Sequence, residues 1–187
     1  MNFLPNRVLL AFFLIGAAPG VDIIEWSATR PLEWSDYKGH VPYQTKHGAV
    51  TAYEVRSTNT FPNWTHVSYE VTCVMIKNRS WVKPEHRADS ALLNHERLHF
   101  DLAECSARAL RSSLQKERVP IKDCNARLQV LRDSVHASWL NIEARYDLET
   151  SHGTIVEEQA RWAEKIAHTL DSLAAYSEPR FVVELKP

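Results

Sequence analysis

The residues best suited to chemistry lie in the run Asn94-His95-Glu96-Arg97-Leu98-His99, which has the pattern H-E-x-x-H. The apolar spacing around it predicts a helix from about residue 87 to residue 115. Residues four apart lie one turn above each other on a helix face, so His95 and His99 can offer two imidazole nitrogens to one metal ion. Glu96, about 100° around the helix, can reach a metal-bound water as a general base. This pattern is typical of a zinc hydrolase.

Apolar side chains surround this pattern, since Leu92, Leu93, Leu98, Phe100 and Leu102 flank the two histidines. The imidazoles are therefore expected in partly dry surroundings, where a polar group without a partner costs free energy. A zinc ion supplies such a partner, because imidazole nitrogens coordinate it at about 2.0–2.1 Å. The pattern thus predicts Zn²⁺ as the cofactor.

A catalytic zinc takes three protein ligands and a water, so a further ligand is needed. A turn near residues 118–121 makes two consecutive helices antiparallel. At about 1.5 Å per residue, straight helices bring Glu143 or Asp147 close to the level of the two histidines. A bent helix, or a ligand offered from the helix end, favours His152 instead. The spacing alone leaves these three alternatives open.

The elements expected to position these residues change character along the chain. Residues 21–84 are typical of short strands, with alternating apolar and polar residues at 50–56 and 67–76. Apolar periodicity and capping residues then predict helices at about 87–115, from Asp123 or Asn125 to Gly153, and at about 154–174, before a final strand at 180–185. Strands followed by helices predict an α+β fold. We expect one domain, residues 21–187, with an N-terminal β-rich half packed on a C-terminal helical half.

The chain resembles the DUF922 family of predicted secreted zinc-dependent proteases. The matching segments are 31–39 (PLEWSDYKG), 93–101 (LNHERLHFD), 146–153 (YDLETSHG), and Gln159 with Trp162. The resemblance implies a zincin-like metallopeptidase domain, and it also places a histidine at the position of His152. We therefore expect His95, His99 and His152 as zinc ligands, with Asp147 and Glu143 as alternatives for the third position.

Tyr146 is a second candidate catalytic residue beside Glu96. Its hydroxyl could donate a hydrogen bond to the oxyanion that forms on a substrate carbonyl. The alternative is that Tyr146 only packs between helices. The full hypothesis is hydrolysis of a peptide bond by a zinc-activated water, with Glu96 taking the proton and passing it to the leaving amine.

The first twenty residues are typical of a secretory signal peptide, because Arg7 precedes an apolar run, residues 8–18, that ends in small residues. The mature chain is therefore expected to be secreted or periplasmic. In that oxidising setting one disulfide among Cys73, Cys105 and Cys124 is plausible, and spacing does not choose the pair.

Composition limits the partners. The 187 residues carry 22 Lys and Arg against 23 Asp and Glu, so there is no basic field for nucleic acid. No second apolar stretch of membrane length follows the first, so stable membrane insertion is not expected after cleavage. The expected partner is a peptide or protein substrate. Two alternatives stay open: a secreted binding or scaffold protein with a structural zinc, and a zinc amidase acting on cell-wall material.

Overall fold

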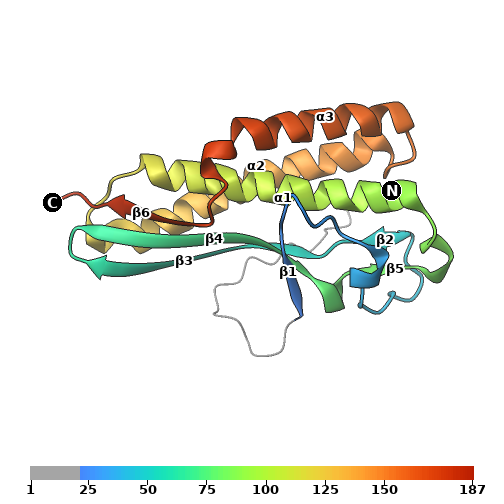
Figure 1. Ribbon diagram of the computed structural model, residues 1–187, viewed down its shortest axis with the longest axis horizontal. Coiled ribbons are helices and arrows are strands. Elements are labelled where there is room, and N and C mark those ends of the chain that lie inside the picture. The colour runs from blue at the N-terminus through green and yellow to red at the C-terminus, as the bar shows by residue number, and fades with distance from the viewer. Residues whose placement is uncertain (1–21) are drawn as a thin grey trace, which may run out of the picture.

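The structure is a computed structural model that describes residues 22–187, and it has the expected mixture of N-terminal strands and C-terminal helices. The expected signal peptide, residues 1–20, lies outside the described residues. The main sheet is built on a long hairpin of β3 (Tyr53–Asn63) and β4 (His66–Ile76). Strands β1 (Ile23–Glu25) and β6 (Arg180–Glu184) pair with different parts of β4, and every pairing is antiparallel (Figure 1).

A second, two-stranded sheet precedes the first long helix. It consists of β2 (Ala49–Val50) paired with β5 (Trp81–Val82). This pairing brings the segment before β3 next to the beginning of the helix that carries the H-E-x-x-H pattern. The connections also contain short 3₁₀ helices at Trp34–Asp36, Lys77–Arg79, Pro84–His86, Ile121–Asp123 and Ala174–Tyr176.

Three long helices make up the other half: α1 (Ser90–Lys116), α2 (Cys124–Thr150) and α3 (Val156–Ser172). Their bounds agree closely with the predicted ranges. Helix α1 begins where the Asp89 carboxylate accepts a hydrogen bond from the Leu92 amide, as expected of an N-cap residue. Helix α2 ends in three consecutive residues with positive φ, Ser151, His152 and Gly153. Only the glycine was expected to adopt this backbone conformation.

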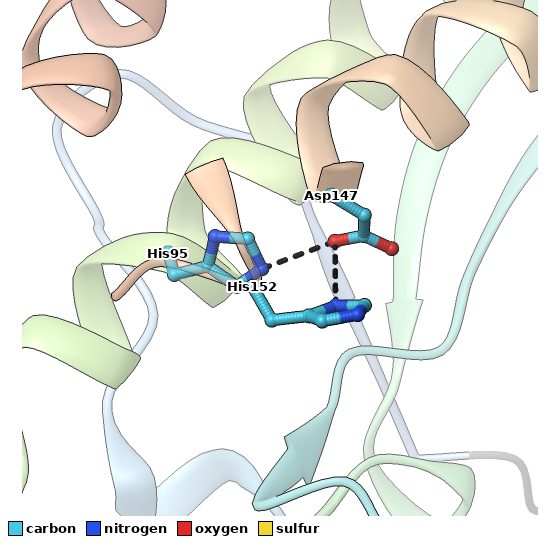
Figure 2. Close-up of side chains that lie close together, drawn as sticks. All are labelled: His95, Asp147 and His152. Carbon is cyan, nitrogen blue, oxygen red and sulfur yellow. Dashed lines mark hydrogen bonds and ion pairs between the residues drawn. The ribbon is translucent and has the colours of Figure 1, made fainter. Parts of the chain in front are cut away.

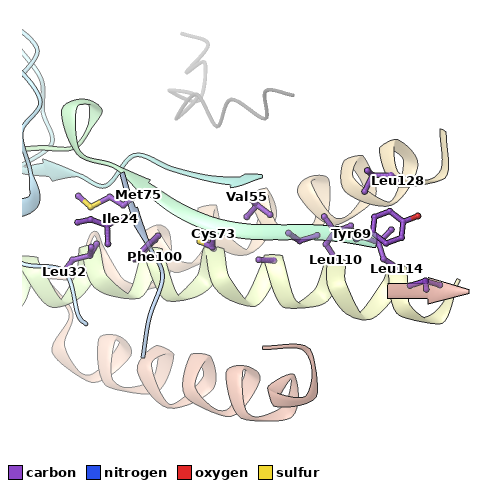
Figure 3. Close-up of a cluster of buried hydrophobic side chains, with 14 of the residues drawn as sticks. Ile24, Leu32, Val55, Tyr69, Cys73, Met75, Phe100, Leu110, Leu114 and Leu128 are labelled. Atoms are coloured by element: carbon purple, nitrogen blue, oxygen red, sulfur yellow. The ribbon is translucent and has the colours of Figure 1, made fainter. Parts of the chain in front are cut away.

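Helix α1 is the centre of the molecule, because it packs on the sheet with one face and on α2 and α3 with the others. Figure 3 shows the larger apolar cluster, in which side chains of α1 such as Phe100 and Leu110 meet Val55 and Met75 of the sheet. A smaller cluster, which includes Leu98 and Leu102, lies on the α2 and α3 side. The H-E-x-x-H residues are therefore held on a helix that is covered from both sides.

A buried ion pair also fixes α1 to the sheet. Arg111 lies 2.9 Å from Glu104 on the same helix, and its Nε donates to the Val71 carbonyl of β4. Both charged side chains are buried. Removing one partner of such a pair leaves an uncompensated charge and is strongly destabilising, so this pair constrains how α1 sits on β4.

The β3 strand is longer than the prediction, which ended it near residue 56. It continues through Pro62 to Asn63, and the pairing with β4 shifts between Thr60 and Asn63. Proline is tolerated there because β3 is an edge strand and the ladder is irregular at that point. The turn between β3 and β4 is therefore formed by Trp64 and Thr65.

The expected disulfide is not formed, and this expectation was wrong: Cys73, Cys105 and Cys124 are all free and buried. Cys73 faces the cluster between the sheet and α1. Cys105 points to the opposite side of α1, with its sulfur 4.0 Å from the Ile166 carbonyl of α3. Cys124 contacts the Pro120 carbonyl at the start of α2. The three thiols therefore pack against different elements.

Within residues 22–187, no helix combines the length and the apolar composition that crossing a membrane requires.

Candidate metal centre

The side chains of one α1 face meet those of α2 in a compact cluster of nitrogen and oxygen atoms. Nε2 of His95 lies 3.2 Å from Nε2 of His99. Oδ1 of Asp147, from α2, lies 3.2 Å from the first nitrogen and 3.0 Å from the second. His152, from the turn after α2, places Nδ1 3.4 Å from the same oxygen. Figure 2 shows one carboxylate oxygen of Asp147 joined by dashed lines to a ring nitrogen of His95 and to one of His152.

These separations are close to, and slightly shorter than, those between the ligands of one zinc ion. Four ligands at about 2.0–2.1 Å from a tetrahedral zinc are about 3.3–3.4 Å from one another. The three atoms contributed by His95, His99 and Asp147 form a triangle with sides of 3.0 to 3.2 Å. His95, Asp147 and His152 likewise offer ligand atoms within 4.8 Å of one another. The donor set, imidazole and carboxylate, suits zinc.

The outer nitrogens of the two α1 histidines are already occupied. Nδ1 of His99 lies 2.5 Å from the Glu143 carboxylate, and Nδ1 of His95 lies 3.2 Å from Oε1 of Gln159. An acceptor at Nδ1 keeps the proton there and leaves the Nε2 lone pair for a metal. With both protons at Nδ1, the two Nε2 atoms and the Asp147 carboxylate are hydrogen-bond acceptors that lie close together with no donor among them. A cation bound between them would interact favourably with all three.

The pKa shifts of His99 and Asp147 also favour a cation in this cluster. Burial alone would lower the pKa of His99, but the Glu143 charge and the hydrogen bonds to Asp147 and Glu143 raise this pKa well above its usual value. Burial alone would raise the pKa of Asp147, but hydrogen bonds from His95 and His99 hold it well below its usual range. The cluster therefore favours positive charge at its centre.

The turn that carries His152 is fitted closely against α1. A Cβ on Gly153 would lie 2.8 Å from the Cβ of His95, and Gly153 has a φ of +82°. A glycine is needed there both for the close approach and for the backbone conformation. The His152 side chain itself is 60% exposed, and its ring centroid lies 5.7 Å from that of His47, in the loop before β2. His152 therefore lies at the open side of the cluster.

The Glu96 side chain contacts the segment before β3. Its Oε2 accepts a hydrogen bond of 2.6 Å from the hydroxyl of Thr51, which in turn lies 2.7 Å from the hydroxyl of Tyr37. Glu96 is 5% exposed, and within residues 22–187 the side-chain hydrogen bond of its carboxylate is made by Oε2 and not by Oε1. One carboxylate oxygen is thus held in place, and the other is available.

Tyr146 is fully buried. Its hydroxyl lies 3.1 Å from the His95 carbonyl and accepts a hydrogen bond of 2.8 Å from Nε2 of Gln159. The ring stacks on the His95 imidazole, with 4.7 Å between the centroids. This arrangement favours the packing alternative, because the hydroxyl is buried and directed at α1 and α3. Tyr146 thus packs on the His95 ring and bonds to the His95 backbone.

The structure thus brings together His95, His99 and His152 of the expected ligands, and Asp147, one of the predicted alternatives for the third position, contacts all three. It places Glu143 behind His99, at the outer nitrogen, and not in the ligand cluster. Two neighbours of the site, Thr51 and His47, were not singled out by the sequence. They come from a segment of irregular structure around β2, where no periodicity indicates which residues face α1.

Comparison with known proteins gives one result. No curated protein and no solved structure matches the chain. The family described as "Bacterial protein of unknown function (DUF922)" matches residues 26–153, a range that contains His95, Glu96, His99, Asp147 and His152. Because this match covers more than half of the chain, the protein belongs to the DUF922 family.

Proposed function

We propose that the protein is a zinc-dependent hydrolase that cleaves peptide bonds. The observation that carries the proposal is the triangle of ligand atoms from His95, His99 and Asp147, whose sides of 3.0 to 3.2 Å are slightly shorter than the roughly 3.3–3.4 Å expected around zinc. Glu96 follows His95 directly on the same helix, as in the H-E-x-x-H pattern of zinc hydrolases. The apolar run at residues 8–18 supports action outside the cytoplasm.

Zinc in such a site lowers the pKa of a bound water to about 7 and polarises a substrate carbonyl. The residues of the chain supply the rest. Glu96 has one oxygen fixed by Thr51 and the other available, so it can take the proton of the attacking water and give it to the leaving amine. Glu143 and Gln159 hold the rings of His99 and His95 in the orientation that directs Nε2 into the cluster.

The general-base assignment is tested by exchanging Glu96 for its amide. The variant Glu96→Gln keeps a similar volume and leaves the three ligand atoms in place, so we expect it to bind zinc like the unaltered protein and to lose turnover on a mixed peptide library. His95→Ala should lose both zinc and turnover. Full turnover by the Glu96→Gln variant would show that Glu96 is not the base.

A second candidate function is a binding or scaffold protein with a structural zinc. It is favoured by His152, which supplies a fourth donor beside the triangle, since a closed set of four protein ligands is typical of structural zinc. The two functions differ in what chelation does. Removing zinc from a structural site should unfold the domain, whereas a catalytic site should stay folded and become inactive. Circular dichroism before and after treatment with a chelator separates the two.

A further inference from the structure

The candidate metal centre is open to solvent at the end of α2. The exposed fraction of the side chain is 3% for His95 and 13% for His99, and it rises to 27% for Asp147 and 60% for His152. Glu143 covers the opposite side, behind His99. A peptide substrate therefore reaches the cluster beside His152.

His47 lies at this open side. Its ring centroid is 5.7 Å from that of His152, whose Nδ1 lies 3.4 Å from Oδ1 of Asp147. His47 is half-buried, and within residues 22–187 its hydrogen bond is made by the backbone N–H, to the Thr45 hydroxyl, and not by the ring. We propose that a ring N–H of His47 donates a hydrogen bond to the oxygen of the scissile carbonyl as that oxygen gains negative charge. The inference rests on the proposed peptide hydrolase.

The chemistry of imidazole suits this role. Hydrolysis of a peptide bond places negative charge on the carbonyl oxygen, and a fixed hydrogen-bond donor at that oxygen lowers the barrier. A neutral imidazole has one N–H in either tautomer, so His47 can donate without gaining a proton. Tyr146 was expected to supply this donor, but its hydroxyl is buried and bonds to α1 and α3. His47 is better placed, because it lies on the side from which a peptide approaches.

The segment that carries His47 is fixed at both of its neighbours, as a preorganised donor requires. The ammonium of Lys83 donates to the Thr45 carbonyl at 3.0 Å, and the Lys83 amide donates to the Gly48 carbonyl at 2.8 Å. A Cβ on Gly48 would lie only 3.0 Å from the Leu92 side chain. This segment therefore packs closely against the first turn of α1.

The same segment also supports the proposed general base. Four residues after His47, the Thr51 hydroxyl holds one oxygen of Glu96 at 2.6 Å. Glu96 would act on the attacking water, and His47 would act on the carbonyl oxygen that the water attacks. Residues 47–51 thus connect the two groups that a single hydrolytic step needs.

The first test measures binding and needs no turnover. The full chain is loaded with Co²⁺, whose visible spectrum reports on its ligands, and is titrated with acetohydroxamate, which offers a carbonyl oxygen to the metal. His47→Leu removes the donor, and His47→Gln keeps one. We expect His47→Leu to bind acetohydroxamate about tenfold more weakly than the unaltered protein, and His47→Gln to stay close to it.

The matched control is His168→Leu, the same change at an exposed position about 18 Å along α3 from Val156. It should bind acetohydroxamate like the unaltered protein. Equal binding by His47→Leu would refute the role of His47 and leave the metal centre intact. A loss of Co²⁺ affinity in His47→Leu would make His47 a ligand and would also overturn the inference. An unaltered chain that takes up no Co²⁺, or whose spectrum ignores acetohydroxamate, would contradict both the inference and the proposed hydrolase.

The second test measures turnover of one peptide that the unaltered zinc-loaded protein cleaves. Loss of a donor used in the transition state lowers kcat, so His47→Leu should reduce kcat by about 100-fold and leave KM nearly unchanged. His47→Gln should restore part of the rate. A raised KM with unchanged kcat would show that His47 only binds the ground state, and would overturn the inference. If no peptide is cleaved, the hydrolase fails, while the acetohydroxamate titration still decides whether His47 donates to an oxygen at the metal.

Discussion

Nε2 of His99 lies 3.0 Å from Oδ1 of Asp147, although 48 positions separate the two residues in the chain. The contact exists because the turn after α1 reverses the chain and α2 runs back along α1. His95 lies on the same face of α1, one turn before His99, so both rings meet the same carboxylate. The site is therefore a property of the α1–α2 pair.

Asp147 should contribute more to zinc affinity than His152. Its oxygen touches both α1 histidines, whereas the His152 side chain is 60% exposed at the helix end. We expect Asp147→Ala to weaken zinc binding by more than about 100-fold, beyond the effect of losing an outer partner, and His152→Ala to weaken it by less than about tenfold. Competition with a chromogenic chelator measures the zinc dissociation constants of the two variants. The reverse ranking would make His152 the third ligand.

Glu143 should raise the zinc affinity of the site without being a ligand of the metal. Its carboxylate accepts from Nδ1 of His99, and loss of such an outer partner typically lowers zinc affinity by about 10–100-fold. We expect Glu143→Gln to show a loss in this range in the same chelator assay. The matched control is Glu149→Gln on the same helix, since Glu149 bonds to Arg145 and Trp162. Equal effects of the two variants would argue against a specific role of Glu143.

Thr51 should act through Glu96. Thr51→Val keeps the shape of the side chain but removes the hydroxyl that donates to Glu96 Oε2. A hydrogen bond to a buried charged group contributes about 1.5–3 kcal/mol, so the free energy of unfolding should fall by roughly that amount. If Glu96 is the base, kcat should also fall while zinc affinity stays unchanged.

Urea denaturation, the zinc titration and the peptide assay separate these effects of Thr51→Val. Thr58→Val, at an exposed position of β3, serves as the control and should change none of the three quantities. A variant Thr51→Val with the stability of the unaltered protein would show that the hydroxyl does not hold Glu96.

The three thiols should be inert in the folded protein. Burial raises the pKa of Cys105 to about 12 and that of Cys73 well above its usual value. Because only the thiolate is alkylated, iodoacetamide at pH 8 should label no cysteine in the native chain and all three in urea. Mass spectrometry counts the labels. Mass and labelling that depend on a prior reductant would show that a disulfide forms after all.

Much of the fold can be predicted from the local pattern of apolar and capping residues in the sequence. The apolar spacing of α1, α2 and α3 predicts their ranges to within a few residues, and Gly153 lies just past the end of α2, as its type predicts. The N-cap role of Asp89 was not predicted. The pairing of His95 with His99 needs only the helical repeat. The extension of β3 through Pro62 was not predictable in this way, because it depends on the strand lying at an edge.

The remainder of the site depends on contacts between distant segments. Which of Glu143, Asp147 and His152 faces the histidines is decided by the register of α2 on α1, which residue counting leaves uncertain by about one turn. Thr51 meets Glu96 across 45 positions because β2 pairs with β5 ahead of α1. Such contacts leave no periodic signal in the sequence.

The account is tested most directly by a crystal structure of the zinc-loaded protein with anomalous data at the zinc edge. We expect one strong peak per chain, at about 2.0–2.2 Å from Nε2 of His95, Nε2 of His99 and Oδ1 of Asp147. A chain that takes up no zinc, or a peak held by other residues while these three side chains remain hydrogen-bonded to one another, would contradict the proposed metal centre.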